Sequence, residues 1–156
     1  MAIIYLGIGT NLGDKEDNLH RAMMLLREKV GDIYNVSSFY VSKPWGFFSE
    51  NDFSNAVLMM DTELNPFDLL ETVKNIEKKM GRMPKKDNAS YEDRMIDIDV
   101  LFYENRVINQ PSLTVPHPHI AERDFVLVPL AEIAPDLVHP TLNKTILQLK
   151  NELPVK

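Results

Sequence analysis

Two aspartates separated by one residue lie in a run that otherwise predicts a strand, Arg94-Met95-Ile96-Asp97-Ile98-Asp99-Val100-Leu101-Phe102. Side chains of a strand alternate between its faces, so Asp97 and Asp99 share one face. The other face then holds Ile96, Ile98, Val100 and Phe102. The two aspartate Cβ atoms would lie about 7 Å apart, and one or two carboxylates together with substrate phosphates are a typical Mg²⁺ site. The alternative is an amphipathic edge strand with two solvated aspartates, although Asp is depleted in strands.

The composition is that of a globular protein of one domain, spanning residues 1–156, with 44% hydrophobic and 26% charged residues. Lys and Arg number 17 against 23 Asp and Glu, a net charge of −6, which disfavours a nucleic-acid partner. There is no cysteine, so disulfides, thiolate metal sites and a cysteine nucleophile are excluded. No signal peptide or membrane span is expected, and we predict a cytoplasmic monomer.

The helices and strands that must position the aspartates are predicted from the periodicity of hydrophobic residues and from residues typical of helix and strand ends. Asp14 and Asn65 predict the starts of two amphipathic helices that end at Gly31 and Gly81. Gly7, Gly9 and Gly13 are interpreted as a tight strand-to-helix turn, since the Walker lysine and the dinucleotide spacing are both missing. The core strands are predicted at 2–6, 33–42, 53–62 and 96–102. The rest of the chain is predicted to contain a turn at 104–105, a strand at 107–108, an extended segment at 111–118, helical turns at 121–130 and a short helix at 142–149.

This order predicts an α+β protein with a ferredoxin-like βαββαβ core, a C-terminal hairpin and short helices. Between the second and third strands, residues 43–52 form a loop with three large aromatic side chains, Trp45, Phe47 and Phe48. Loops lie on the surface, so these rings indicate either a ring-binding lid or a satellite packing cluster. The long polar segment 82–93 is also typical of a functional lid.

The chain resembles the 6-hydroxymethyl-7,8-dihydropterin pyrophosphokinase family over nearly its whole length. Seven segments in the right order carry the resemblance: Gly9-Thr10-Asn11-Leu12-Gly13-Asp14, Ser37-Ser38-Phe39-Tyr40, Phe53-Ser54-Asn55-Ala56, Ile76-Glu77-Lys78-Lys79-Met80-Gly81-Arg82, Arg94-Met95-Ile96-Asp97-Ile98-Asp99, Leu113-Thr114-Val115-Pro116-His117 and Arg123-Asp124-Phe125-Val126-Leu127-Val128-Pro129-Leu130.

The resemblance implies transfer of diphosphate from ATP to the hydroxymethyl group of the reduced pterin, giving AMP, in tetrahydrofolate biosynthesis. By the same resemblance, Asp97 and Asp99 hold two Mg²⁺ ions and act in catalysis with Arg82 and Arg94. The implied nucleotide positions are Glu77, Arg82, Arg94, Ile98, His117 and Arg123. The implied pterin positions are Ser42, Pro44, Trp45, Phe53, Asn55 and Phe125, with Tyr91 as a possible further ring.

Phosphoryl-type transfer depends mainly on positioning and charge neutralisation, which metals and arginines supply. A flat pterin suits a slot between two rings, for which Phe53 and Phe125 are the candidates. Asn55 offers both an acceptor and donors to a heterocycle edge.

The chain departs from the family pattern before the signature arginine, where Tyr91-Glu92-Asp93 replaces a small residue and a proline. Pro84 replaces a basic residue, and Pro118 a tyrosine.

Two other classes of protein are alternatives to a pyrophosphokinase. Another metal-dependent transferase with an Asp-x-Asp strand would release pyrophosphate or a nucleoside diphosphate. A βαββαβ RNA-binding module is disfavoured by the acidic balance and by the lack of its aromatic strand motif.

Overall fold

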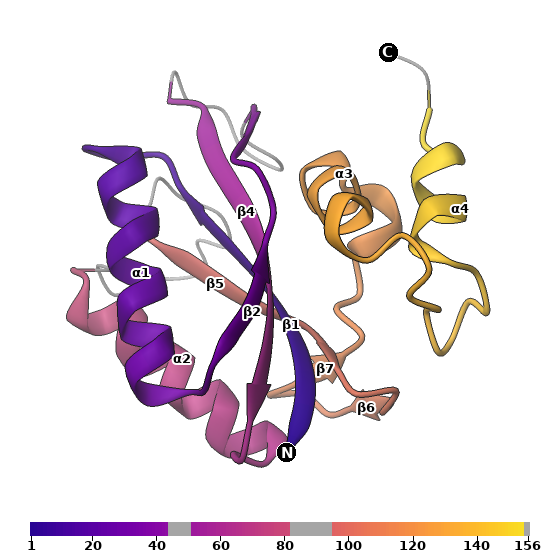
Figure 1. Cartoon of the computed structure of the whole chain (residues 1–156), viewed down its shortest axis with the longest axis horizontal. Coiled ribbons are helices and arrows are strands. Elements are labelled where there is room, and N and C mark those ends of the chain that lie inside the picture. The colour runs from indigo at the N-terminus through magenta and orange to yellow at the C-terminus, as the bar shows by residue number, and fades with distance from the viewer. Residues whose placement is uncertain (44–50, 82–94, 155–156) are drawn as a thin grey trace.

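A computed structural model describes residues 1–43, 51–81 and 95–154. It is a mixed α/β structure in which an antiparallel sheet lies between two helical layers (Figure 1). The first half contains β1 (Ala2–Thr10), α1 (Lys15–Lys29), β2 (Ile33–Val36), β3 (Tyr40–Ser42), β4 (Phe53–Thr62) and α2 (Pro66–Lys79). The second half contains β5 (Asp97–Tyr103), β6 (Ile108–Asn109), β7 (Thr114–Val115), the 3-10 helix η1 (Ile120–Glu122), α3 (Asp124–Ile133) and α4 (Ile146–Asn151).

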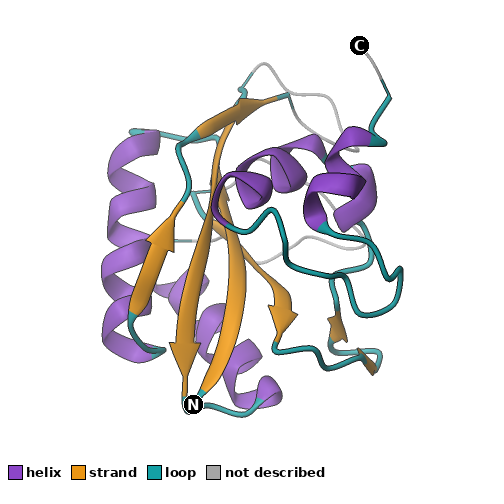
Figure 2. Cartoon of the chain, turned by 45° about the vertical axis from the view of Figure 1, so that its right-hand side comes forward, coloured by secondary structure: helices purple, strands orange, loops and turns teal. Residues whose placement is uncertain are grey.

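The sheet runs in the order β2-β4-β1-β5, and β3 also pairs with β4. All of these pairings are antiparallel. β6 and β7 form a separate two-stranded hairpin, which appears as two short arrows beyond the main sheet in Figure 2. Strand β1 is therefore central, with β4 on one side of it and β5 on the other.

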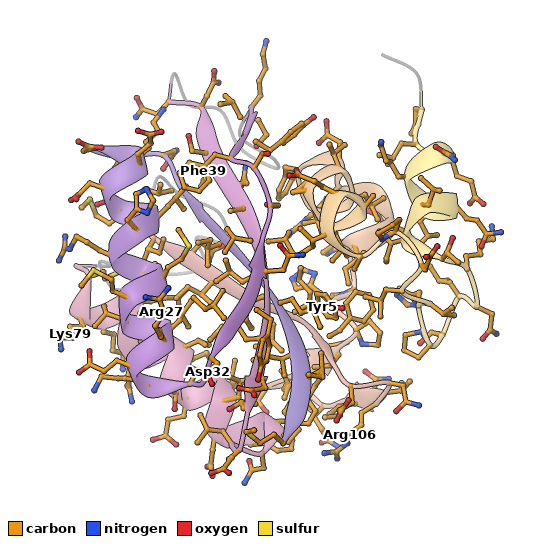
Figure 3. The ribbon with its side chains drawn as sticks, viewed as in Figure 1. Tyr5, Arg27, Asp32, Phe39, Lys79 and Arg106 are labelled. Carbon is orange, nitrogen blue, oxygen red and sulfur yellow. The ribbon has the colours of Figure 1, made fainter. Side chains whose placement is uncertain are left out.

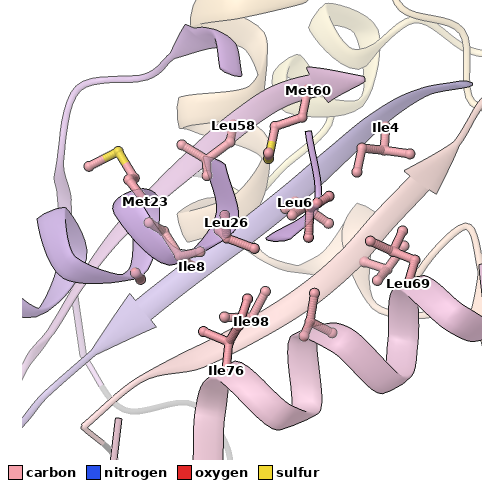
Figure 4. Packing of buried hydrophobic residues seen from close by; sticks show 14 of the residues in the cluster. Ile4, Leu6, Ile8, Met23, Leu26, Leu58, Met60, Leu69, Ile76 and Ile98 are labelled. Atoms are coloured by element: carbon pink, nitrogen blue, oxygen red, sulfur yellow. The ribbon is translucent and has the colours of Figure 1, made fainter. Parts of the chain in front are cut away.

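The sheet has a hydrophobic core on each face. On the side of α1 and α2, β1 contributes Ile4, Leu6 and Ile8, which pack against both helices (Figure 4). On the side of α3 and α4, the core includes Tyr5 and Leu101 (Figure 3).

The helix starts follow local signals. The Asp14 side chain accepts a hydrogen bond from Asp17 N at 3.1 Å, and Asn65 accepts one from Asp68 N at 2.9 Å. Pro66 is the first residue of α2, where its missing N–H is harmless. The last helix begins at Ile146, later than predicted, because Thr145 and Gln148 form a capping box there.

The predicted strand 33–42 is wrong as a single element, because it divides into β2 and β3. Between them, Ser37 N donates to Val57 O, and Ser37 Oγ accepts from Val57 N at 2.9 Å. A side chain that bonds the neighbouring strand in this way replaces the regular ladder.

The predicted face of Phe102 is also wrong. The pairing of β1 with β5 shifts between Tyr5 and Leu6, so that Leu101 is the extra residue of a bulge. A bulge reverses the alternation beyond it. Phe102 therefore lies with Leu101 in the core on the side of α3, while Val100 stays on the side of α1 and α2.

The predicted turn at Gly7, Gly9 and Gly13 is wrong for the first two of these residues. Gly7 and Gly9 lie inside β1, which extends to Thr10, and only Gly13, with φ of 66°, belongs to the turn. In the part of the chain that the structure describes, no helix is long and apolar enough to cross a membrane.

Candidate active site

The acidic pair lies on the edge strand of the described sheet. Asp97 and Asp99 are partly exposed and alternate with the buried residues Ile98 and Val100 of the core on the side of α1 and α2. The aspartates thus project from the face on the side of α3, as strand alternation predicts. Among residues 1–43, 51–81 and 95–154, no group of three or more His, Asp or Glu could hold a metal ion.

Asp99 faces two basic side chains from the chain segment that follows the hairpin. Arg123 Nη1 lies 3.8 Å from Asp99 Oδ2, and His117 Nε2 lies 4.0 Å from Asp99 Oδ1. Arg123 is only 6% exposed, so its guanidinium is a buried charge and not a surface one. The backbone sets this arrangement, because His117 N donates to Leu101 O at 3.1 Å and so attaches the segment to β5.

The imidazole of His117 is neutral near pH 7. Burial, with the positive charges of Arg123 and His119, lowers its pKa to about 4, although Asp97 acts in the opposite direction. His117 Nδ1 accepts from His119 N at 3.3 Å, and a backbone N–H can only donate. The ring proton is therefore on Nε2, the atom that faces Asp99, and is available as a hydrogen-bond donor there.

Glu77 supports the acidic strand from the opposite layer. Its carboxylate, 3% exposed near the end of α2, accepts a hydrogen bond from Ile98 N at 2.8 Å. Ile98 is the residue between the two aspartates, and its side chain is buried against α1 and α2. Of Ile98, only the backbone therefore faces the site.

A second set of polar residues lies across the sheet from the aspartates. Asn55 on β4 pairs with Gly9, which in turn pairs with Asp97. Two spacings between neighbouring strands separate Asn55 from Asp97, about 9.5 Å. A Cβ atom on Gly9 would lie 2.9 Å from Asn55 Oδ1 and 3.6 Å from Phe53 Cδ1. Glycine at this position therefore leaves room for the Asn55 oxygen and the Phe53 ring, which lie over the backbone of Gly9.

The side-chain amide of Asn55 has a defined orientation. Its Nδ2 donates to Tyr40 O at 3.0 Å and to Ser42 Oγ at 2.9 Å. A backbone carbonyl can only accept, so the nitrogen must face β3 and the oxygen must face Gly9. The expectation that Asn55 offers donors as well as an acceptor is therefore revised: its donors are used by β3, and Oδ1 is turned toward Gly9.

The structure brings together some of the predicted site residues and does not describe others. Asp99, His117 and Arg123 form one group, Ser42, Phe53 and Asn55 a second, and the ring of Phe125 lies 5.4 Å from the Arg123 guanidinium carbon. The predictions for Pro44, Trp45, Arg82, Tyr91 and Arg94 fall outside the described residues, as do residues 44–50 of the first proposed lid and all of the second.

Sequence reasoning missed that Gly7 and Gly9 lie on one face of β1 and that Gly9 leaves room for the Asn55 side chain. Their spacing of two inside a strand placed both on one face, which was the available signal. It also missed the 3.3 Å hydrogen bond between the side chains of Tyr40 and Asp124, which lie 84 positions apart in the sequence. No local pattern indicates such a contact.

Comparison with known proteins agrees with this geometry. Residues 5–135 match the family model "7,8-dihydro-6-hydroxymethylpterin-pyrophosphokinase (HPPK)". The chain is 43% identical over 141 residues to a 2-amino-4-hydroxy-6-hydroxymethyldihydropteridine pyrophosphokinase of Porphyromonas gingivalis, covering 90% of this chain and 95% of that one. A relative of the same name from Aquifex aeolicus is 40% identical over 156 residues, covering 100% and 95%.

The fold is similar to that of a solved Plasmodium falciparum HPPK-DHPS, with a TM-score of 0.79 at 20% identity. The match covers 97% of this chain and 43% of that one, so the chain spans less than half of that structure.

The class that these findings define is that of enzymes that transfer a diphosphate group. Within that class, the chain belongs to the 7,8-dihydro-6-hydroxymethylpterin-pyrophosphokinase family.

Proposed function

We propose that the chain transfers the terminal diphosphate of ATP to the hydroxymethyl oxygen of 6-hydroxymethyl-7,8-dihydropterin in tetrahydrofolate biosynthesis. The hydroxymethyl oxygen forms a bond to the β-phosphorus, and the bond from that phosphorus to the α–β bridging oxygen breaks. AMP leaves with the electron pair, and the hydroxyl proton passes to solvent. The single observation that carries the proposal is the family match over residues 5–135, which includes the acidic strand.

Asp97 and Asp99 would hold two Mg²⁺ ions, in keeping with the family resemblance. Their donor set fits, because two partly exposed carboxylates on one face leave ligand positions for phosphate oxygens. When bound, the ions neutralise the triphosphate charge and orient it. Glu77 holds the backbone of the strand between the two aspartates by accepting a hydrogen bond from Ile98 N.

Arg123 and His117 would bind the phosphate chain of ATP beside Asp99. The guanidinium is permanently charged, and the neutral imidazole donates through Nε2–H without adding charge. By resemblance, Arg82 and Arg94 complete the catalytic set, and Glu77 and Ile98 belong to the nucleotide side. The Glu77 carboxylate is buried and already accepts a hydrogen bond from Ile98 N. We therefore assign Glu77 to positioning of the strand.

The pterin would lie over Gly9, between the Asn55 oxygen and the acidic pair. Asn55 Oδ1 accepts from N–H groups of the heterocycle, and Phe53 contributes its ring beside position 9. Ser42 and Phe125 border this surface, and the resemblance adds Pro44, Trp45 and Tyr91. The separation of about 9.5 Å between Asn55 and Asp97 suits a flat bicycle whose hydroxymethyl arm points at the phosphates.

We further assign the βαββαβ core to the ferredoxin-like class. The sheet order β2-β4-β1-β5, with α1 and α2 packed on one face, supports this assignment. One domain over residues 1–156, a monomeric state, a cytoplasmic location and the absence of a nucleic-acid partner stay predictions.

The proposal is tested by product analysis. Incubation with MgATP and the hydroxymethyl dihydropterin should release AMP in a ratio of one to one with pterin diphosphate. Omission of the pterin should abolish AMP release, and EDTA should do the same. Release of ADP, or no turnover by protein with a cooperative melting transition, would contradict the proposed reaction. Asp136→Asn, a change at an exposed carboxylate, should retain the rate and serves as the control for charge removal.

A further inference from the structure

Helix α3 is attached to the segment that contains β3 at two places. At its far end, the Glu132 carboxylate accepts from Ser38 N at 3.0 and 3.1 Å and from Ser38 Oγ at 2.8 Å. At its first residue, Asp124 Oδ2 accepts from Tyr40 OH at 3.3 Å. Eight residues of helix separate the two carboxylates, about 12 Å.

The attachment at Asp124 lies between residues of the proposed site. The preceding residue, Arg123, faces Asp99, and its guanidinium carbon lies 5.4 Å from the ring of the following one, Phe125. A displacement of Asp124 would therefore move both the proposed phosphate-binding cation and a proposed ring of the pterin site. The attachment at Glu132 has no such neighbours, because it lies at the other end of the helix.

Tyr40 connects α3 to the sheet. Its ring hydroxyl reaches α3, while its backbone oxygen accepts from Asn55 Nδ2 at 3.0 Å. The same residue thus contacts the helix that carries Arg123 and Phe125 and orients the amide of Asn55. The contacts form one continuous series from Asp124 through Tyr40 to Asn55.

We propose that Tyr40 and Asp124 are positioning residues that fix the distance between the Arg123–Phe125 end of α3 and the Asn55 side of the pterin site. This inference rests on the proposed function. The hydrogen bond between them acts on pterin affinity through Asn55 and Phe125, and neither side chain needs to touch the substrate. The Ser38–Glu132 contact supplies stability to the same interface without setting that distance.

The test is a double-mutant cycle read out on pterin binding. Tyr40→Phe and Asp124→Ala should each raise KM and the equilibrium Kd for the pterin about three- to ten-fold, the range of one hydrogen bond. The KM for ATP should rise in the same variants, because Arg123 would be displaced together with Asp124. The double variant should be no worse than either single one, because both remove the same bond. Asp124→Asn should restore affinity close to wild type, because its amide oxygen still accepts from the tyrosine hydroxyl.

Glu132→Ala is the matched control for loss of stability. It should lower the melting temperature at least as much as Tyr40→Phe and leave the pterin Kd within two-fold of wild type. Additive effects in the cycle, an unchanged pterin Kd in Tyr40→Phe, or an equal rise in Glu132→Ala would overturn the inference while wild-type turnover stands. If the wild-type enzyme releases no AMP, the proposed function fails first and this inference with it.

Discussion

Substitution of Gly9 by alanine should damage pterin binding much more than it damages the fold. The added Cβ would lie 2.9 Å from Asn55 Oδ1, closer than such atoms approach, so the Asn55 side chain must move. Movement lengthens its bonds to Tyr40 O and Ser42 Oγ, now 3.0 and 2.9 Å. The bonds stretch without breaking, so the fold loses little, whereas Oδ1 leaves the position in which it is proposed to accept from the pterin. Loss of that one hydrogen bond should weaken pterin binding by about 0.5–1.5 kcal/mol.

That loss corresponds to a rise of about 2- to 13-fold in KM and Kd for the pterin. Gly7 provides the control, because it lies on the same strand and face. The nearest heavy atoms to a Cβ there are Cδ1, Cδ2 and Cγ of Leu101, at ordinary contact distances of 3.5, 3.6 and 3.7 Å. Gly7→Ala should therefore bind the pterin normally and gain slightly in stability, since alanine restricts the unfolded chain.

The assay is pterin titration by intrinsic fluorescence, together with initial rates at saturating MgATP and thermal melting of both variants. A pterin Kd in Gly9→Ala within two-fold of wild type would refute the reasoning. So would equal damage in Gly7→Ala, which would show that the strand tolerates no side chain at either position.

Three further outcomes are expected. Asp97→Ala and Asp99→Ala should each lower turnover by about 10³-fold or more and leave the melting temperature nearly unchanged, and a wild-type rate in either would exclude the metal role. Glu77→Ala should destabilise the fold by about 1–3 kcal/mol in denaturant titration, because Ile98 N–H loses its buried acceptor, whereas Glu77→Gln should lose much less. Burial lowers the pKa of His139 in the folded state, so acid should favour unfolding as pH falls below the ordinary value of 6.5. Unfolding midpoints at pH 8 and pH 5 should then differ more for wild type than for His139→Asn, which keeps an acceptor for Thr141 N and Leu142 N but cannot titrate.

The sequence predicted the helices and the order of elements well, because these depend on nearby residues. Asp14 and Asn65 cap their helices through bonds to residues three positions ahead. The bulge at Leu101 and the division at Ser37 could not be predicted in this way. Each depends on which residue of another strand lies opposite, and that pairing is set by the whole sheet.

The acidic pair was visible in the sequence because strand periodicity alone places both carboxylates on one face. The approach of Arg123 and His117 to Asp99 was not, since a contact between residues 18 or more positions apart has no local signature. Only the family resemblance connected them beforehand. The orientation of Asn55 required the structure as well, because it follows from the carbonyl of Tyr40 on a neighbouring strand.

The Glu77 carboxylate has a consequence for how the protein avoids association with itself. Among the described strands, β5 is the last in the order β2-β4-β1-β5, and an unpaired outer strand invites pairing with another chain. The bond from Ile98 N to Glu77 removes one outward donor from that row, and the Glu77 side chain stands where a foreign carbonyl would have to approach. One side chain of α2 can thereby protect the margin of the sheet against aggregation while leaving the two neighbouring carboxylates open to small ligands.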